Sequence, residues 1–445
     1  MGAQLAGDPE RTARARYRGG VALAFAAAWA LGAWLGPYDT GDSGQYLWQA
    51  VNLEAGRPPY AGDWAAPRDS VRFSLRPPGY AALVVAARAT SEDPRWLAAL
   101  QSVLGAATWF LVWTILERAG TERRAGPLWL GLVATPATLV YAQVAMADTA
   151  FTALVVAALW RWTVFADTGR AREVVAANAL VAAALWVKPV VLYVWPGTLA
   201  LSAWALWRRG RRGAALAPAL SAGLVPLAAA GLVALNVGWT GSAEVSSIQT
   251  LNLVEYNAQR TLARTGEPEV YDRAAARAAQ IPGYAERQRW RRDWALGVIA
   301  DRPGPYAAIH ATGVAAFFLD PGRFDLALFL RLDSPGGGMR AGSQRGAGGV
   351  GGVIARQPPA LLAALAVLFA VNAAVAVAFA AWVVWARAPV EVRLAAFGLV
   401  AYLALVAGPV GSARYRLAAA PILALSLPWA AAALRQRLDA RRRLA

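Results

Sequence analysis

Long apolar runs dominate the chain, and short polar segments separate them. A membrane-spanning helix needs about 20 mostly apolar residues. Ten runs approach that length, at residues 20–36, 96–117, 125–145, 149–166, 173–187, 189–207, 213–238, 359–386, 393–410 and 416–434. The pattern predicts an all-α polytopic membrane protein with about 10 transmembrane helices, in a range of 9–13. The first run is longer than the apolar part of a signal peptide, so we expect an uncleaved anchor.

Two longer polar tracts interrupt the apolar runs and suggest three regions. Residues 1–238 form an N-terminal transmembrane module whose first loop is 37–95, residues 239–358 form a second polar region, and residues 359–445 carry the C-terminal helices. The first loop ends in Ala81–Ala89, which is too short to span a membrane and is expected at or just inside its surface. The second tract predicts helices at 254–263, 284–300 and 305–318, followed by a flexible glycine-rich stretch at 335–352.

Composition narrows the possible chemistry. The chain is 58% hydrophobic and 16% charged, which fits a membrane protein better than a soluble one. It has no cysteine, so disulfides, thiol nucleophiles and thiolate metal sites are excluded. His310 is its only histidine, which argues against multi-histidine metal sites and is expected to be structural.

The net charge of +17 first suggests a nucleic-acid partner, but its distribution excludes one. Arginine-rich loops are typical of the cytoplasmic side of a membrane protein. With a cytoplasmic N-terminus, 21 arginines and 8 acidic residues fall in the inner segments 1–19, 117–126, 161–173, 208–212, 386–393 and 435–445. Ten crossings then also return the C-terminus to the cytoplasm. We therefore predict a plasma-membrane protein whose two polar tracts, with any active site that they carry, are extracytoplasmic. The excess of arginine over lysine and the abundance of alanine indicate a bacterial source.

The first outer loop contains three polar motifs. Tyr38–Tyr46 follows the first span and includes Asp42, Gly62-Asp63-Trp64 precedes Pro67, and Arg76-Pro77-Pro78 comes near the end of the loop. Asp42 either caps the following helix or points into a cleft. The two prolines hold the backbone beside Arg76, which could bind a phosphate or anchor lipid headgroups.

The remaining candidates lie at the outer ends of later spans. Asp148 stands between two apolar helices, where an unpartnered carboxylate is costly, and its alternative role is a helix cap. Lys188, the only lysine, precedes Pro189 and either binds an anion or reaches for the membrane surface. Arg414 and Arg416 lie in an outer turn against the usual charge bias, which favours an anionic partner.

The order of these motifs resembles the GT-C superfamily of polyprenyl-phosphate-sugar-dependent glycosyltransferases. The group most similar is the glycosyltransferase-39, protein O-mannosyltransferase and lipid A aminoarabinose transferase group. The family's loop motif Asp-Glu-x-x-Tyr corresponds to Asp42–Tyr46. Its Gly-Asp-Trp, the proline that follows and its Lys/Arg-Pro-Pro resemble Gly62-Asp63-Trp64, Pro67 and Arg76-Pro77-Pro78. Its second acidic residue resembles Asp148, and its late Arg-Tyr resembles Arg414-Tyr415-Arg416. Two departures are Ser43 in place of the second acid and Arg76 in place of the commoner lysine.

The resemblance implies an inverting transfer of a sugar from a polyprenyl phosphate to an acceptor hydroxyl on a glycan, lipid or protein. A carboxylate can take the hydroxyl proton, and cations can stabilise the leaving phosphate. We expect Asp42 as the base, Asp148 as a second acidic contact, and Tyr46, Asp63, Trp64, Arg76, Lys188, Arg414, Tyr415 and Arg416 as substrate-binding residues. No cofactor is required on this interpretation; a divalent cation between Asp42 and Asp148 is an alternative that no ligand spacing indicates.

Two other functions stay open at this stage. A transporter or flippase for a lipid-linked anion would need charged residues near the centres of the spans, where the sequence has none, and an inverted repeat, which is not visible. A non-catalytic protein that binds polyprenyl phosphate would not require Asp42 and Arg76 together.

Overall fold

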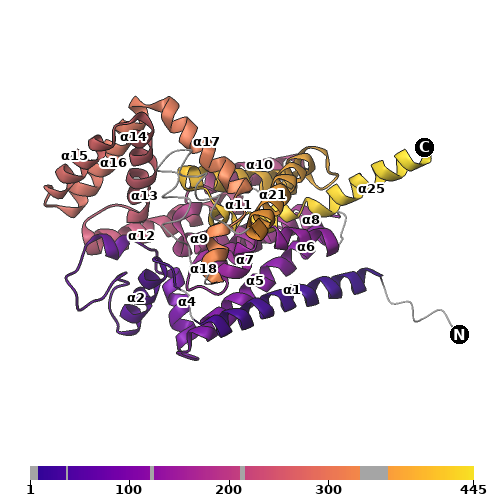
Figure 1. The fold of residues 1–445 in the computed structure, drawn as a ribbon, viewed down its shortest axis with the longest axis horizontal. Helices are drawn as coiled ribbons and strands as arrows, with labels where there is room; N and C mark the ends of the chain where they lie inside the picture. The colour runs from indigo at the N-terminus through magenta and orange to yellow at the C-terminus, as the bar shows by residue number, and fades with distance from the viewer. Residues whose placement is uncertain (1–8, 37–38, 121–124, 211–215, 331–358, 445) are drawn as a thin grey trace.

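The computed structural model describes residues 9–36, 39–120, 125–210, 216–330 and 359–444 (Figure 1). These residues form helices and connecting turns, and no strand occurs among them. The helices that precede the second polar tract are α1 (Pro9–Leu35), α2 (Ser43–Glu54), α3 (Val71–Ser74), α4 (Gly79–Arg88), α5 (Pro94–Arg118), α6 (Ala125–Val133), α7 (Ala137–Tyr141), α8 (Asp148–Thr168), α9 (Ala171–Val187), η1 (Pro189–Val191), α10 (Trp195–Arg208), α11 (Leu216–Ala222) and α12 (Leu224–Thr240).

The second polar tract and the C-terminal region continue the all-helical chain. The tract contains α13 (Ser247–Asn252), the π-helix η3 (Leu253–Ala258), α14 (Gln259–Thr265), α15 (Pro268–Ala279), α16 (Tyr284–Asp301), α17 (Pro303–Leu319) and α18 (Arg323–Phe329). The C-terminal helices are α21 (Pro359–Trp385), α22 (Val390–Ala407), η4 (Gly408–Val410), α23 (Ala413–Arg416), α24 (Ala420–Ala424) and α25 (Leu427–Leu444). The three helices predicted within the tract are confirmed, and the glycine-rich stretch lies outside the described residues.

Six helices are long and apolar enough to cross a membrane, by length and composition, in the described part of the chain. They are Glu10–Leu35, Pro94–Arg118, Asp148–Thr168, Ala219–Thr240, Pro359–Trp385 and Val390–Val410. Each coincides with one of the ten predicted runs. Together with the all-helical architecture, they confirm the predicted fold class, an all-α integral membrane protein.

The other four predicted runs are shorter or interrupted helices, and prolines account for most of the breaks. Pro136 separates α6 from α7, and Pro428 lies at the start of α25 after α24 has ended. Pro189 ends α9, because a residue before proline is driven out of the helical region. Lys188 accordingly has an extended backbone, with φ −148° and ψ 124°.

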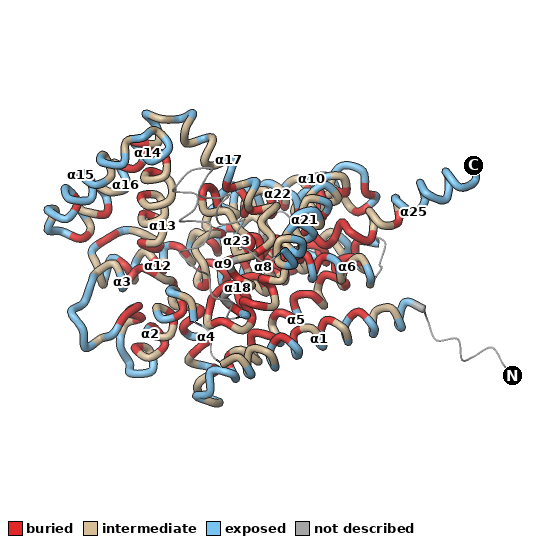
Figure 2. The backbone as a smooth tube through the Cα atoms, viewed as in Figure 1, coloured by how far each residue is buried: buried red, intermediate tan, exposed pale blue. Residues whose placement is uncertain are grey.

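The core of the bundle is built around α5, α8 and α9 (Figure 2). Of the most apolar 18 residues of each helix, 67% are buried in α8 and 11% in α21. Helix α8 is therefore central in the bundle and α21 peripheral. The rings of Trp109 and Trp113 in α5 are buried, and Tyr17 of α1 stacks on Trp113 at 5.3 Å between centroids. Exposed side chains on α21, such as Val377 and Trp385, form an apolar surface suited to lipid.

The stretch at residues 81–89, expected at or just inside the membrane surface, forms a helix that packs against the rest of the protein. It is α4, and Tyr80 and Val84 on it are fully buried. Gly79 allows this approach, because a Cβ at that position would lie 2.6 Å from the carbonyl oxygen of Trp186. The end of the first outer loop is thereby held against the end of α9.

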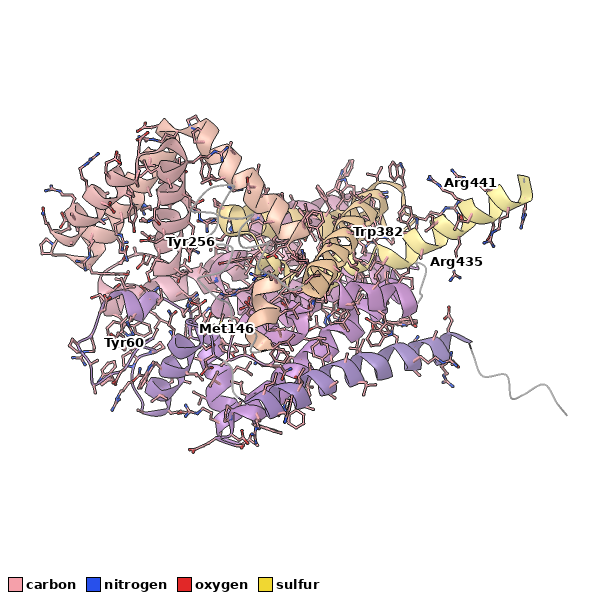
Figure 3. All side chains as sticks on the ribbon, in the orientation of Figure 1. Tyr60, Met146, Tyr256, Trp382, Arg435 and Arg441 are labelled. Carbon is pink, nitrogen blue, oxygen red and sulfur yellow. The ribbon has the colours of Figure 1, made fainter. Side chains whose placement is uncertain are left out.

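The two polar tracts gather at one end of the molecule, and both described chain ends lie at the other (Figure 1). In Figure 3, Tyr60 marks the first tract, while Arg435 and Arg441 lie on the projecting end of α25. In the second tract a small separate core forms from Val254, Ala258, Leu262, Ala295 and Val298. The two polar tracts and the chain ends thus lie at opposite ends of the bundle, as the distribution of charge among the loops predicts. Which end faces the cytoplasm stays a prediction.

A reporter fusion tests that orientation. The arginine bias assigns the second tract to the outer side of the membrane. A reporter enzyme that functions only outside the cytoplasm should therefore be active when it is joined after residue 250. A fusion after residue 209, in an arginine-rich inner segment, should give the opposite result. A cytoplasmic signal at residue 250 would overturn the placement of both polar tracts.

Candidate active site

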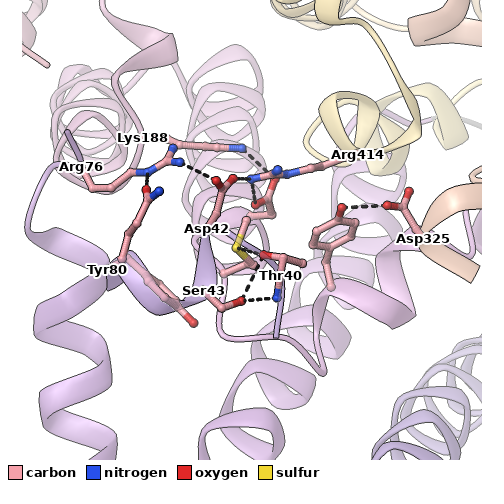
Figure 4. Close-up of polar contacts among 12 residues, drawn as sticks. Thr40, Asp42, Ser43, Arg76, Tyr80, Lys188, Asp325 and Arg414 are labelled. Atoms are coloured by element: carbon pink, nitrogen blue, oxygen red, sulfur yellow. Dashed lines mark hydrogen bonds and ion pairs between the residues drawn. The ribbon is translucent and has the colours of Figure 1, made fainter. Parts of the chain in front are cut away.

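Five charged side chains meet where the polar tracts join the bundle (Figure 4). Arg76 Nη2 lies 2.8 Å from Asp42 Oδ1, and Arg414 Nη2 lies 2.9 Å from Asp42 Oδ2. Lys188 Nζ lies 2.7 Å from Asp148 Oδ1, and Arg414 Nη2 lies 3.6 Å from Asp148 Oδ2. We call these five residues the charged cluster. They come from α2, α4, α8, α9 and α23 or the turns beside them.

Asp42 directly precedes α2, but its side chain makes no capping hydrogen bond to that helix. The nearby hydroxyl of Ser43, where the GT-C motif has its second acid, instead accepts the Thr40 N–H at 3.0 Å. The Asp42 carboxylate is therefore committed to the two arginines. The helix-cap alternative for Asp42 is not what the structure shows.

Asp148 is the first residue of α8 and is 2% exposed. Its Oδ1 accepts a hydrogen bond from Lys188, whereas its buried Oδ2 has no hydrogen-bond partner among the described residues. Burying a carboxylate without a cation would be strongly unfavourable. Lys188 and Arg414 therefore make this burial possible, and Pro189 positions Lys188 by ending α9.

Arg76 is held by aromatic and polar groups of α2. Its Nε donates to Gln45 Oε1 at 2.8 Å, and its guanidinium lies 5.4 Å from the ring centroid of Tyr46. Tyr46 is 1% exposed and packs edge-on against Tyr80. Tyr46, expected in substrate binding, therefore lies directly beside the cluster.

Arg414 links the two acids of the cluster. Its guanidinium contacts both Asp42 and Asp148 and lies 5.7 Å from the ring centroid of Tyr141. The next residue, Tyr415, has its ring centroid 5.8 Å from Lys188 Nζ. Tyr415 thus contacts the charged cluster of which Arg414 is a member, and the role of both residues in substrate binding stays a prediction.

The electrostatics of the cluster favour binding of an anion. Burial disfavours the charged form of Asp42, but Arg76 and Arg414 outweigh it, so the pKa of Asp42 lies below its ordinary value. Three cations and two carboxylates leave a net charge of +1. One singly charged phosphate would neutralise it.

Arg416 lies apart from the cluster, although it is only two residues from Arg414. It is 1% exposed, and its guanidinium donates to the carbonyl oxygens of Phe317, Phe318 and Asp320 at 2.8–3.1 Å. These carbonyls end α17, where a helix lacks internal partners. The contacts of Arg416 are those of a structural residue, and a role in substrate binding stays a prediction.

Asp63 and Trp64 are likewise not brought to the cluster. Asp63 is exposed and accepts the Ala65 N–H at 2.9 Å within its own turn. Trp64 packs edge-on against Tyr60 and Phe73. Their contacts stabilise the first outer loop, and their predicted contact with substrate stays untested.

Asp325 is a third carboxylate beside the cluster that the sequence did not suggest. Its Oδ1 accepts a hydrogen bond from Tyr141 at 2.8 Å, and Tyr141 is the residue whose ring faces Arg414. Among the described residues no cation forms an ion pair with it. Burial, assisted by the charge of Asp320, raises the pKa of Asp325 from 3.8 to about 6. The second tract carries no recognisable motif at Asp325, so only the fold identifies it.

Asp325→Asn should stabilise the protein at neutral pH but not in acid. An acid whose pKa is raised by folding destabilises the folded state once the pH exceeds its pKa in the unfolded chain, here about 4. The loss of folding free energy grows with pH and reaches its full value above the folded-state pKa of about 6. A shift from 3.8 to about 6 corresponds to roughly 3 kcal/mol. Thermal unfolding in detergent should show a higher Tm for the variant at pH 7.5 and no gain at pH 4. Asp293→Asn on exposed α16 is the control; a gain at both pH values would contradict the prediction.

A cavity of about 330 Å³ lies between α1, α2, α4 and the start of α5. Apolar side chains such as Trp29, Leu47 and Val84 form part of its wall, and charged residues form another part (Arg88, Glu92, Asp93 and Arg95). Asp39, three residues before Asp42, also lines it. The cavity therefore reaches the segment that carries Asp42, although no residue of the charged cluster lines it.

Among the described residues, no group of three or more His, Asp or Glu side chains is arranged to hold a metal ion. Arg and Lys already occupy the four described carboxylate contacts of Asp42 and Asp148.

Solved structures that are similar to this chain include ArnT and EmbB. ArnT from Cupriavidus metallidurans, bound to undecaprenyl phosphate, matches over 92% of this chain and 77% of its own, with 17% sequence identity and a TM-score of 0.38. Arabinosyltransferase EmbB from Mycobacterium smegmatis matches over 93% and 41%, with 16% identity and a TM-score of 0.38. Both are GT-C enzymes, the class that the sequence motifs resemble. At this level of similarity neither structure assigns a role to a residue of this chain.

No protein-family model matches the sequence, and no curated protein is similar enough to be matched. The function proposed below therefore rests on the motifs and on the geometry of the charged cluster.

Proposed function

We propose that this protein is a membrane glycosyltransferase that moves a sugar from a polyprenyl-phosphate donor to an acceptor hydroxyl outside the cytoplasm. The observation that carries the proposal is the charged cluster, in which three partly buried cations and two carboxylates, with a net charge of +1, meet at the ends of candidate membrane helices. A polyprenyl phosphate has its phosphate at the membrane surface and its chain in the bilayer. A phosphate site at helix ends fits that geometry.

In this proposal Arg76, Arg414 and Lys188 bind the donor phosphate. An arginine fork binds two phosphate oxygens at once, and lysine adds a compact charge. Both arginines now hold Asp42, so the phosphate competes with that carboxylate for them. Donor binding would loosen the hold on Asp42 and raise its pKa towards the ordinary value, which makes Asp42 a better base.

The transfer step balances charge within the cluster. The acceptor oxygen forms a bond to the anomeric carbon on the face opposite the phosphate, and the bond from that carbon to the phosphate oxygen breaks. The electron pair of that bond leaves with the phosphate, while the acceptor proton passes to Asp42. Asp42 thus loses a negative charge as the phosphate gains one, and the same arginines stabilise the new charge without rearrangement. Asp148 holds Lys188 and Arg414 in place and contacts sugar or acceptor.

In this proposal the apolar part of the cavity wall, which includes Trp29, Leu47 and Val84, receives the first isoprenoid units of the donor. The cavity opens between α1 and α5, both candidate membrane spans, and reaches Asp39. A chain lying there would bring its phosphate to the turn that carries Asp42. Undecaprenyl phosphate, which is bound in the ArnT structure, belongs to the ligand class that we propose.

The test uses the full chain in liposomes that contain lipid-phosphate sugars extracted from bacterial membranes. A glycosyltransferase releases free polyprenyl phosphate when acceptor lipids or glycans are present, and mass spectrometry detects both products. Comparison of envelope glycans and lipids from cells with and without the protein identifies sugar and acceptor. Binding of the donor, or its movement between leaflets, without release of polyprenyl phosphate would overturn the proposal in favour of a binder or a flippase.

A further inference from the structure

The peptide groups on both sides of Arg76 are held by buried side chains. The carbonyl oxygen of Leu75 accepts a hydrogen bond from Ser246 Oγ at 2.9 Å, and that of Arg76 accepts one from Gln49 Nε2 at 2.8 Å. A peptide group is planar, so holding its oxygen sets the orientation of the whole unit. Together the two bonds determine the direction in which the Arg76 side chain leaves the backbone.

The two donors come from different polar tracts. Gln49 belongs to α2 in the first tract, whereas Ser246 precedes α13 in the second. Ser246 is fully buried and also caps α13 by accepting the Ile248 N–H. Asn236 Nδ2 donates to the carbonyl oxygens of Glu244 and Val245, so the turn that carries Ser246 is itself fastened to α12.

Further buried bonds join the same turn to α3, the short helix before Arg76. Ser247 Oγ donates to the carbonyl oxygen of Val71 at 3.1 Å. Ser74 Oγ and the Tyr284 hydroxyl both donate to Glu244 Oε1, at 3.0 and 2.7 Å. Ser74 is 2% exposed and Tyr284 8%, so both hydroxyl donors are buried, while their acceptor Glu244 is half-buried. The second tract is thus hydrogen-bonded to the segment that precedes and positions Arg76.

We infer that Ser246 is a positioning residue for Arg76, and that residues 242–247 thereby set the affinity of the charged cluster for a lipid phosphate. The inference rests on the proposed function, in which Arg76 binds that phosphate. Arg76 makes an ion pair with Asp42 and a hydrogen bond to Gln45, both at 2.8 Å, and such forked contacts depend on orientation. A small displacement of a binding group can weaken its effect strongly.

The experiment measures binding of undecaprenyl phosphate to the purified full-length protein in detergent, by native mass spectrometry. Ser246→Ala leaves a buried carbonyl oxygen unpaired and should weaken binding roughly tenfold. Ser246→Thr keeps the hydroxyl and should restore most of the affinity. In the Arg76→Ala background, Ser246→Ala should cause no further loss, because it acts through Arg76.

The matched control is Ser202→Ala in α10. Ser202 is equally buried, but its hydroxyl donates to the Thr198 carbonyl of its own helix, so affinity should not change in either background. Should Ser246→Ala not fold, Glu244→Gln weakens the same attachment and should show the same dependence on Arg76. Equal losses from Ser246→Ala with and without Arg76 would overturn the inference. A normal affinity of Arg76→Ala itself would instead refute the phosphate role of Arg76 and the proposed function with it.

Discussion

Asp42→Asn should abolish sugar transfer while leaving the protein folded and in the membrane. Asparagine has nearly the shape of aspartate but cannot accept the acceptor proton, and loss of a general base costs on the order of 10²- to 10⁴-fold in rate. Arg76 and Arg414 lose their carboxylate partner, so the variant should bind undecaprenyl phosphate at least as tightly as the original protein. The measurement is release of polyprenyl phosphate in liposomes, beside binding of undecaprenyl phosphate.

This opposite response of binding and turnover distinguishes a base from a merely structural aspartate. Asp272→Asn, an exposed acid on α15, is the control and should change neither quantity. Normal turnover of Asp42→Asn would remove Asp42 as the base. The base would then have to be sought among the other acids near the cluster, Asp148 and Asp325.

Arg414→Ala should cause the largest loss of donor affinity. Arg414 is the one side chain of the cluster that contacts both acids, so its removal takes away a proposed phosphate ligand and lowers the net charge of the cluster from +1 to zero. Truncating one partner of a buried charge pair costs about 2–5 kcal/mol, or at least roughly 30-fold in affinity. Titration with undecaprenyl phosphate measures the loss directly.

Two further variants make that measurement specific. Arg414→Lys keeps the charge but loses the fork that spans two carboxylates, so its affinity should fall between those of the original protein and Arg414→Ala. Arg277→Ala, on the exposed surface of α15, should bind normally. If Arg414→Ala bound undecaprenyl phosphate with unchanged affinity, Arg414 would not be a phosphate ligand.

The apolar pattern predicted the architecture because membrane spans need long apolar runs. Where a run contains no proline in its centre, as at 96–117 and 149–166, one helix covers it. Where proline interrupts a run, as at Pro136, the helix breaks. Helix breaks were thus readable in part from the sequence, but the burial of α4 was not, because it depends on how closely Gly79 approaches α9.

The residues of the candidate site were also predictable from the sequence only in part. Motif order pointed to Asp42, Arg76, Asp148 and Arg414, and a position at the end of a span pointed to Lys188. The structure brings these five together. The same reasoning treated Arg416 like Arg414, because the two differ little in sequence context. Their side chains leave α23 in different directions, one to the acids and one to the end of α17.

The sequence by itself determined that this is a membrane protein and which charged residues lie at the ends of its apolar segments. The length, hydropathy and charge of a segment are local properties that can be read without the fold. Only the tertiary structure decided which of those groups share a site. Asp42 and Arg414 are 372 residues apart, and Ser246 lies 171 residues from Leu75. Contacts over such separations depend on the rotation and packing of whole helices. For that reason Asp325 and Ser246, which belong to no motif, became visible only in the fold.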